Sequence, residues 1–246
     1  MAIELIRDVA RKAADIALET LWPTRCAVCD LAGESVICTK CEDALFPIDL
    51  CLACPICGAP YGRIQCTECN EVMLNGAGIS SIPMEKMSHA LVLDEAARRI
   101  VSIYKDSDER RLCGFIAERM SRYVDPEIIR RGYAIAFIPD SKEALKRRGF
   151  DHSEEIATEL SRIVGLECAR LFERPRSADQ RKLGRNERME NMRGSLQVKR
   201  DIPMPESVLV VDDVCTTGAT IYAACKALRD AGVKSVCALT FAQVME

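Results

Sequence analysis

Residues Val208 to Thr220 read VLVVDDVCTTGAT, and this stretch decides the fold. It begins with four aliphatic residues, Val208 to Val211, a run too short and too apolar for a solvated helix. Such a run predicts a strand buried on both faces, as in a parallel sheet. A helical pattern then extends from Ala219 to about Ala231 and stops at Gly232. The stretch therefore predicts an α/β fold, and it lies where parallel sheets bind ligands, beyond the carboxyl end of a strand.

The connection between this strand and this helix has the chemistry of a phosphate and sugar site. Two carboxylates, Asp212 and Asp213, would accept hydrogen bonds from sugar hydroxyls. Free N–H groups at a helix N-terminus, together with threonine hydroxyls, bind phosphate. The residues that would supply them are Thr216, Thr217, Gly218, Ala219 and Thr220. A Walker A loop is excluded because the Gly-Lys-Ser/Thr ending is missing, so we expect one phosphate beside one ribose. The alternative is an ordinary capped helix after a buried strand, with both aspartates as surface polar residues.

Length and composition limit the class of protein. The 246 residues are enough for one large domain or two. No apolar run reaches the ~18 residues of a membrane span. Charged residues interrupt the N-terminal stretch, so we expect no signal peptide but an amphipathic helix over residues 1–23. The expected location is the cytoplasm, where fourteen cysteines favour metal binding and free thiols over disulfides.

Eight of the cysteines form two copies of the pattern Cys-x2-Cys-x8-Cys-x2-Cys. The copies are Cys26, Cys29, Cys38 and Cys41, and, 28 residues later, Cys54, Cys57, Cys66 and Cys69. Two Cys-x2-Cys pairs complete a tetrahedral four-sulfur zinc site, and such closed sites are structural. We therefore predict two structural zinc ions in a double zinc-ribbon module over residues 24–74. The repeat favours one ion per copy, although the spacing leaves an interleaved arrangement open. Cys51 lies outside the repeat and is interpreted as a free thiol.

The charge of this module argues against nucleic-acid binding. Residues 1–72 hold six basic against eleven acidic side chains, and thiolates on zinc add further negative charge. Phosphate backbones require the opposite sign, so docking of a protein partner is the better expectation. Single-stranded DNA is a weaker candidate, since six Phe, five Tyr and one Trp leave few rings for base stacking.

Residues 75–246 are predicted to form one domain. Its expected elements include helices over residues 109–123 and 153–164 and a strand over residues 133–138. The two histidines of the chain, His152 among them, are interpreted as ordinary surface polar residues. The segment 173–193 has almost no core-forming residues and holds seven basic against four acidic side chains. Arginine forks match phosphate oxygens, so we expect this loop to close over a pyrophosphate group.

Three motifs in order resemble the ComF family. They are the cysteine repeats, the RRGF sequence at Arg147–Phe150 together with the Gln180–Gly194 motif, and VLVVDDVCTTGAT, which looks like the phosphoribosyl-pyrophosphate (PRPP) signature of type I phosphoribosyltransferases. The resemblance covers roughly residues 23–242. It implies a zinc-ribbon module joined to a type I phosphoribosyltransferase-like parallel sheet flanked by helices. Some members of the family are linked to DNA uptake in bacterial transformation.

The resemblance also implies a reaction and roles for residues. A phosphoribosyltransferase would transfer the 5-phosphoribosyl group of PRPP to an acceptor, with release of pyrophosphate and with Mg²⁺ on the substrate. Asp212 and Asp213 would hold the ribose hydroxyls, and Thr216 to Thr220 the 5′-phosphate. The side chains expected at pyrophosphate are Arg147, Arg148, Arg185, Arg188 and Arg193. The alternative is a non-catalytic adaptor that binds a phosphorylated ligand or single-stranded DNA.

Two departures from the family pattern bear on turnover. Pro139-Asp140-Ser141-Lys142 stands where the family usually has a Pro-Val-Pro-Leu-His-Pro type stretch. Asp151 and His152 stand where Asn-Gln is usual. Because Asp140 would lie in the pyrophosphate loop, its carboxylate is expected to oppose the ligand's charge unless Mg²⁺ or Lys142 compensates it.

Overall fold

The computed structural model describes residues 23–72, 81–107, 109–174 and 196–245. The chain forms two compact units, Met1–Leu45 and Phe46–Glu246. This division differs from the boundaries predicted at residues 23/24 and 74/75, because it falls between the two cysteine repeats. The second repeat belongs to the same unit as the sheet. The predicted N-terminal helix, apart from its last residue, lies outside the described residues.

The smaller unit is built around the first cysteine repeat. An isolated antiparallel bridge joins Arg25 to Ala32, and Cys26 N–H donates to the Leu31 carbonyl at 2.9 Å. The short helix α2 (Thr39–Asp43) then begins directly after Cys38. Cys26 and Cys41 are buried. A unit of this size has little apolar core, so its cysteines are the expected source of its stability.

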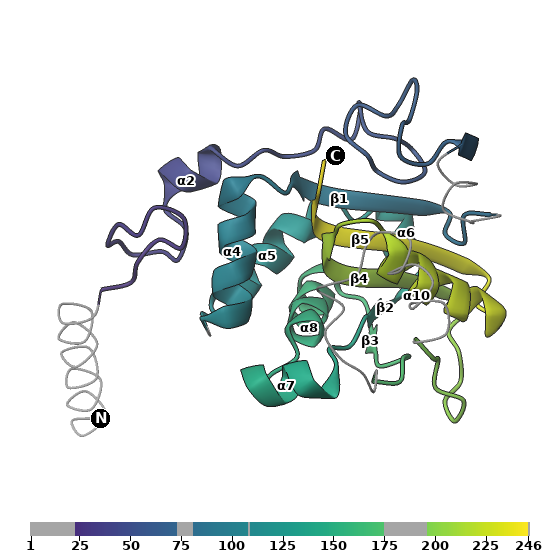
Figure 1. Ribbon diagram of the computed structural model, residues 1–246. Helices are drawn as coiled ribbons and strands as arrows, with labels where there is room; N and C mark the ends of the chain where they lie inside the picture. Colours follow the sequence, from purple (N-terminus) through teal and green to yellow (C-terminus); the bar gives the residue numbers. More distant parts are fainter. Residues whose placement is uncertain (1–22, 73–80, 108, 175–195, 246) are drawn as a thin grey trace. The chain divides into compact units, whose positions relative to one another are not determined.

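The larger unit contains one five-stranded sheet whose strands all run parallel, as predicted. Its spatial order is β1-β5-β4-β2-β3 (Figure 1). The strands are β1 (Lys86–Val92), β2 (Ala134–Phe137), β3 (Cys168–Ala169), β4 (Ser207–Cys215) and β5 (Ser235–Gln243). The strand predicted to end at Val211 continues to Cys215 because the long partner β5 pairs with it that far, Asp212 with Thr240 and Cys215 with Gln243. Asp212 and Asp213 thus lie within a strand.

Helices cover both faces of this sheet. They are α4 (Glu95–Asp106), α5 (Leu112–Ser121), α6 (Pro126–Arg130), α7 (Lys142–Arg148), α8 (His152–Val164) and α10 (Ala219–Asp230). Aspartate or serine caps four of them, and the Asp151 side chain accepts from Glu154 N–H at the start of α8. No described helix combines the length and the apolar character needed to cross a membrane.

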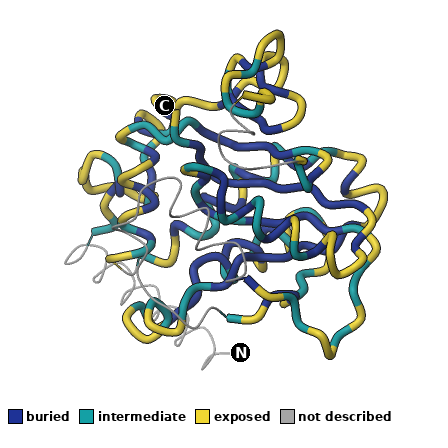
Figure 2. Tube along the Cα trace, turned by 45° about the vertical axis from the view of Figure 1, so that its right-hand side comes forward, coloured by how far each residue is buried: buried dark blue, intermediate teal, exposed yellow. Residues whose placement is uncertain are grey.

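Alternate residues of the strands pack against different layers. Val208 and Val210 of β4 share an apolar cluster with Ala224 and Leu228 of α10, and the second cysteine repeat joins that cluster. Helices α5 and α8 pack on each other, and α8 contacts β4 and β2. Most residues of β1, β2, β4 and β5 are buried, whereas many residues of the connecting loops are exposed (Figure 2). This rigid sheet positions the loops at its carboxyl edge.

Candidate functional site

The chain order creates a topological switch point between the carboxyl ends of β2 and β4, the place where doubly wound sheets form a ligand-binding crevice. From β2 the chain moves outward to β3, and from β4 it moves the other way to β5. At such a switch point, the loops that follow the two neighbouring strands diverge and leave room for a ligand. Asp140 comes shortly after β2, and Asp212 and Asp213 lie near the end of β4. The sheet therefore brings together residues that are 72 positions apart in the sequence.

Asp213 points into the protein and is paired there with two cations. Its side chain is 6% exposed, and one oxygen forms an ion pair with Lys105 Nζ at the end of α4. The other oxygen, Oδ1, lies 3.6 Å from His152 Nε2. Burial alone would raise the pKa of Asp213, but the charges of Lys105 and His152 outweigh burial and hold it well below its usual range. Asp213 is ionised at neutral pH.

His152 is not the surface residue that the sequence predicted. Its side chain is 7% exposed, and its Nδ1 lies 2.6 Å from Asp140 Oδ2. The residue is the first of α8, and the cap formed by Asp151 turns it inward toward β4. Burial by itself lowers the pKa of His152, but the Asp213 charge and the bonds to both aspartates raise it to about 9. The ring is therefore an imidazolium at neutral pH.

The Asp140 carboxylate is compensated by neighbours that the sequence did not connect to it. Arg148 Nη1 donates to both carboxylate oxygens at 3.1 Å. Although burial raises the pKa of Asp140, His152 and then Arg148 lower it below its usual value. The charge of Asp140 is thus compensated by Arg148 and His152, and not by the Lys142 that the sequence suggested. Arg148, expected at pyrophosphate, is directed at Asp140, and Arg147 is exposed on α7.

One arginine of the basic segment 173–193 is described and reaches the same edge. Arg174 Nη1 donates to the Asp140 carbonyl at 2.9 Å and to Asp151 Oδ2 at 2.6 Å. Asp151 Oδ2 also accepts from the Asp140 N–H at 3.1 Å. These bonds fix the backbone of the loop that follows β2. The predicted catalytic residues Arg185, Arg188 and Arg193 lie outside the described residues.

Asp212 differs from its neighbour. It is partly exposed, and its Oδ1 accepts from Ser153 Oγ at 3.2 Å and from the Asp213 N–H at 3.0 Å. Burial and the adjacent Asp213 charge raise the pKa of Asp212 to about 7. The two aspartates of the acidic pair are therefore not equivalent, because Asp213 points inward and Asp212 lies at the crevice.

The Thr-Thr-Gly turn follows β4 and begins α10. Gly218 caps this helix with φ 72°, and no side chain of the described residues caps it in addition. A Cβ at Gly218 would lie 3.3 Å from two atoms of the Tyr222 ring. The positive φ favours glycine, and a larger residue would in addition have to displace the Tyr222 ring by a few tenths of an ångström. Ala219 N–H has only a long contact of 3.4 Å to Thr217 Oγ1, so the helix N-terminus presents donors suited to phosphate.

The eight repeat cysteines form two separate groups, one per copy. Within each group the four sulfurs all lie within 4.8 Å of one another. Sulfur–sulfur distances within the groups are 3.8 Å for Cys29 to Cys38, 3.6 Å for Cys54 to Cys69 and 3.5 Å for Cys57 to Cys66. Sulfurs ~2.3 Å from a tetrahedral zinc are ~3.8 Å apart, whereas a disulfide requires ~2.05 Å. The donor sets fit zinc, and the grouping is sequential and not interleaved. Cys51 is exposed and belongs to neither group.

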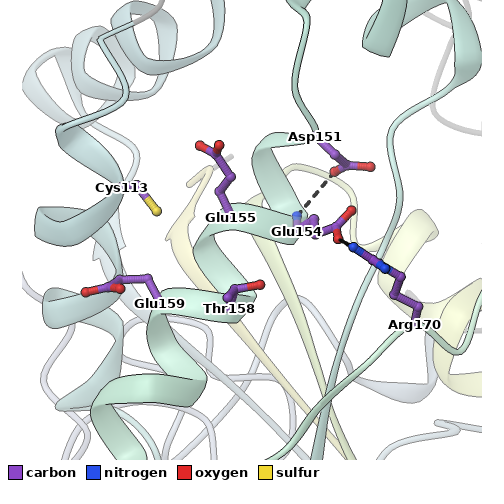
Figure 3. Close-up of a pocket in the computed structure, with 7 residues that line it drawn as sticks. All are labelled: Cys113, Asp151, Glu154, Glu155, Thr158, Glu159 and Arg170. Atoms are coloured by element: carbon purple, nitrogen blue, oxygen red, sulfur yellow. Dashed lines mark hydrogen bonds and ion pairs between the residues drawn. The ribbon is translucent and has the colours of Figure 1, made fainter.

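A shallow hollow of ≈ 550 Å³ lies beside the site, between α5 and α8 (Figure 3). Its lining residues are Cys113, Asp151, Glu154, Glu155, Thr158, Glu159 and Arg170. Its carboxylates are already paired with arginines, Glu154 with Arg170 and Glu155 with Arg110. An acidic surface compensated in this way is unsuited to PRPP, so the switch point is the better candidate site.

Comparison with known proteins indicates the class of protein that this chain resembles. Residues 144–246 match the phosphoribosyl transferase domain, in agreement with the parallel sheet and the turn after β4. The chain is 26% identical over 207 residues to the Competence protein ComFC of Streptococcus pneumoniae (strain ATCC BAA-255 / R6), covering 82% of this chain and 86% of that protein. These two findings confirm the resemblance drawn from the motifs.

Solved phosphoribosyltransferases show more distant likeness. Orotate phosphoribosyltransferase from Aeropyrum pernix is 21% identical, with 63% of this chain and 67% of that chain covered and a TM-score of 0.33. A hypoxanthine phosphoribosyltransferase from Staphylococcus aureus is 12% identical, with 53% and 64% covered and a TM-score of 0.33. No residue role here depends on either likeness.

Proposed function

We propose that the protein binds PRPP at the crevice between β2 and β4 and transfers its 5-phosphoribosyl group to an acceptor, releasing pyrophosphate. One segment at the switch point supplies both Asp212 and the helix N-terminus at Gly218, which is suited to phosphate. This observation is the main support for the proposal. The match of residues 144–246 to the phosphoribosyl transferase domain supports it. In this reaction the bond from the anomeric carbon to pyrophosphate breaks, and a bond to the acceptor nucleophile forms.

Each part of the site has a role in that substitution. Asp212 accepts hydrogen bonds from the ribose hydroxyls, and the residues Thr216 to Thr220 hold the 5′-phosphate. Arg147 on α7 and the arginines at 185, 188 and 193 neutralise the pyrophosphate as it leaves. Bound together with PRPP, Mg²⁺ would supply further positive charge to the leaving pyrophosphate. Protein groups contribute mainly by positioning and charge.

The cysteine groups take structural zinc in this proposal. Four thiolates leave no coordination position for water or substrate, so neither ion takes part in the transfer. Reduced thiolates persist in a reducing compartment, which supports a cytoplasmic location. The resemblance to the pneumococcal competence protein supports a role in DNA uptake, with the first cysteine repeat docking a protein partner.

Calorimetry with PRPP and Mg²⁺ tests the ligand. Wild-type protein should bind, and Asp212→Asn should weaken binding about tenfold or more, because a charge-assisted hydrogen bond to the ribose is lost. Asp230→Asn is the matched control, since Asp230 lies at the far end of α10 and pairs there with Lys226. Equal affinity of Asp212→Asn and wild type would place the ribose elsewhere.

A non-catalytic adaptor that binds a phosphorylated ligand is a second candidate function, and one contact favours it. Arg148 donates to both carboxylate oxygens of Asp140, which leaves fewer cations for pyrophosphate. An adaptor would bind PRPP or a single-stranded oligonucleotide without releasing pyrophosphate when amines or nucleobases are offered. Release of pyrophosphate that depends on an added acceptor would exclude it.

A further inference from the structure

Five side chains form a continuous charged row behind the crevice. They are Arg148, Asp140, His152, Asp213 and Lys105, with side-chain exposures of 10%, 11%, 7%, 6% and 21%. The links are 3.1 Å from Arg148 Nη1 to Asp140, 2.6 Å from Asp140 to His152 Nδ1, and 3.6 Å from His152 Nε2 to Asp213 Oδ1. The ion pair of Asp213 with Lys105 completes the row. The row connects the helices α4, α7 and α8, the strand β4 and the loop after β2.

Charges alternate along this row. Each carboxylate lies between two cations, and His152 is the only member that contacts both carboxylates. Other groups also face the ring: Arg148 Nη1 is 3.1 Å from Nδ1, and the Tyr104 hydroxyl donates to the His152 carbonyl at 3.1 Å. The ring nitrogens face one carboxylate each, at 2.6 Å and 3.6 Å, and an imidazolium carries an N–H on both sides whereas a neutral ring carries one. The two flanking carboxylates therefore favour the protonated form of His152.

The first two residues of α8 contact the two members of the acidic pair. His152 faces Asp213, and Ser153 Oγ donates to Asp212 at 3.2 Å. One oxygen of each aspartate lies within 4.8 Å of the other and of a His152 ring nitrogen, and the Asp213 N–H donates to Asp212 Oδ1 at 3.0 Å. Holding Asp213 in place therefore also fixes a backbone donor that orients Asp212.

We propose that His152, oriented by Asp140, is a positioning residue that holds Asp213 inside the protein so that Asp212 presents its carboxylate to the ribose. The inference deepens the proposed function and depends on it. It assigns a purpose to both departures from the family pattern, because Asp140 and His152 are partners. It also changes the role expected for Asp213, which supports the ribose site from behind and does not bind the sugar.

Two measurements test this assignment. The first is histidine ring NMR, because the chain has only two histidines. Burial lowers the pKa of His89 to about 4 and so separates it from His152. In untagged protein one ring should therefore titrate near 4 and the other near 9. In Asp140→Asn the high pKa should fall, because one of the two carboxylates that stabilise the imidazolium is neutral. A His152 ring that titrates near 6.5 in wild type would overturn the proposal.

The second measurement is PRPP/Mg²⁺ affinity as a function of pH. Wild-type affinity should rise as Asp212 ionises near pH 7, and it should weaken above about pH 9, where His152 loses its proton. His152→Gln should bind about tenfold more weakly at pH 7 and lose that pH dependence, since glutamine carries no charge to lose. The variant should raise KM for PRPP more than it lowers kcat. Glu159→Gln, on the exposed part of α8, is the control.

The outcomes separate the two proposals. Absence of PRPP binding by wild type would overturn the proposed function, while the NMR titration would still test the charged row. Wild-type binding together with an unchanged affinity of His152→Gln would overturn the role of His152 alone. If His152→Gln does not fold, Asp140→Asn replaces it, and its affinity should begin to weaken at a lower pH than that of wild type, because the pKa of His152 is lower in this variant.

Discussion

Replacing Cys66 by serine should unfold most of the larger unit, whereas replacing Cys38 should leave that unit folded. The two cysteines hold equivalent places in the two copies of the repeat, but the copies belong to different compact units. Cys38→Ser therefore disturbs only residues up to about Leu45. Cys66→Ser removes a ligand from a group that is part of the apolar core beside the sheet.

Packing explains the size of this difference. Cys54 and Cys57 are 5% and 4% exposed, and they share a cluster with Ile221 and Ala224 of α10. The Cys57 carbonyl lies 2.9 Å from Nε2 of the fully buried His89, whose Nδ1 is 2.6 Å from Thr240 Oγ1. Structural zinc contributes ~10–16 kcal/mol of apparent binding free energy. Loss of a large part of that amount is comparable with the ~5–15 kcal/mol by which a typical domain is stable.

The same cluster connects the second cysteine group to the phosphate turn. Tyr222 packs against the cluster. Burial raises the pKa of the Tyr222 hydroxyl, and the nearby thiolate charges of Cys57 and Cys69 raise it further. Its ring also lies beside Gly218. Partial loss of the second zinc should therefore loosen the start of α10 before it affects the smaller unit.

Metal analysis, thermal unfolding and hydrogen exchange measure these effects. Wild type should hold two zinc ions per chain and each variant one. Amide exchange over residues 216–224 should accelerate in Cys66→Ser and stay unchanged in Cys38→Ser. Equal unfolding temperatures for the two variants, or a wild-type zinc content near zero after purification without chelator, would contradict the prediction.

The sequence predicted the features that depend on local pattern. An unbroken aliphatic run indicated the buried strand β4, and the regular cysteine spacing indicated the two donor groups. Pattern alone could not show that the second group is part of the larger unit, because this depends on contacts with α10 and β1. The length of β4 was underestimated, since pairing with β5 carries the strand through two acidic residues that propensity alone would exclude.

The site was predicted less completely than the fold. The residues of the turn at Gly218 are consecutive, so their chemistry was visible in the sequence. The partners of Asp213 come from two distant helices, and nothing near Lys105 marks it as a ligand of an acidic pair. One local signal was available for His152. Asp151 followed three residues later by Glu154 is typical of a helix start, and a side chain at the first position of a helix that packs on a sheet can be directed inward.

Neutralising the two adjacent aspartates should change stability in opposite directions. Asp213→Asn should destabilise the protein by about 3–5 kcal/mol at pH 7, because Lys105 and His152 would keep buried positive charge without a full partner. Asp212→Asn should stabilise it at pH 8 by roughly 1–2 kcal/mol, because the like charge beside Asp213 is removed. The asparagine oxygen can still accept from Ser153 and from the Asp213 N–H.

The pH dependence follows from the direction of each pKa shift. Asp212 has a folded-state pKa of about 7, above the ordinary 3.8, so its ionisation costs stability as the pH rises from 3.8 through 7. The gain from Asp212→Asn should thus be large at pH 8 and small at pH 4. Asp213 has a folded-state pKa well below 3.8, so its contribution is present above that value and is lost as the pH falls below it. The loss caused by Asp213→Asn should therefore shrink in acid.

Urea unfolding of both variants and wild type at pH 4, 6 and 8 gives the required free energies. Asp230→Asn serves again as control, with a change of less than about 0.5 kcal/mol, because it lies at an exposed end of α10. A more stable Asp212→Asn protein that binds PRPP more weakly would show that the like charge at this position is retained for binding and not for folding. A destabilised Asp212→Asn protein at pH 8, or an unaffected Asp213→Asn protein at pH 7, would contradict the division of roles between the two aspartates.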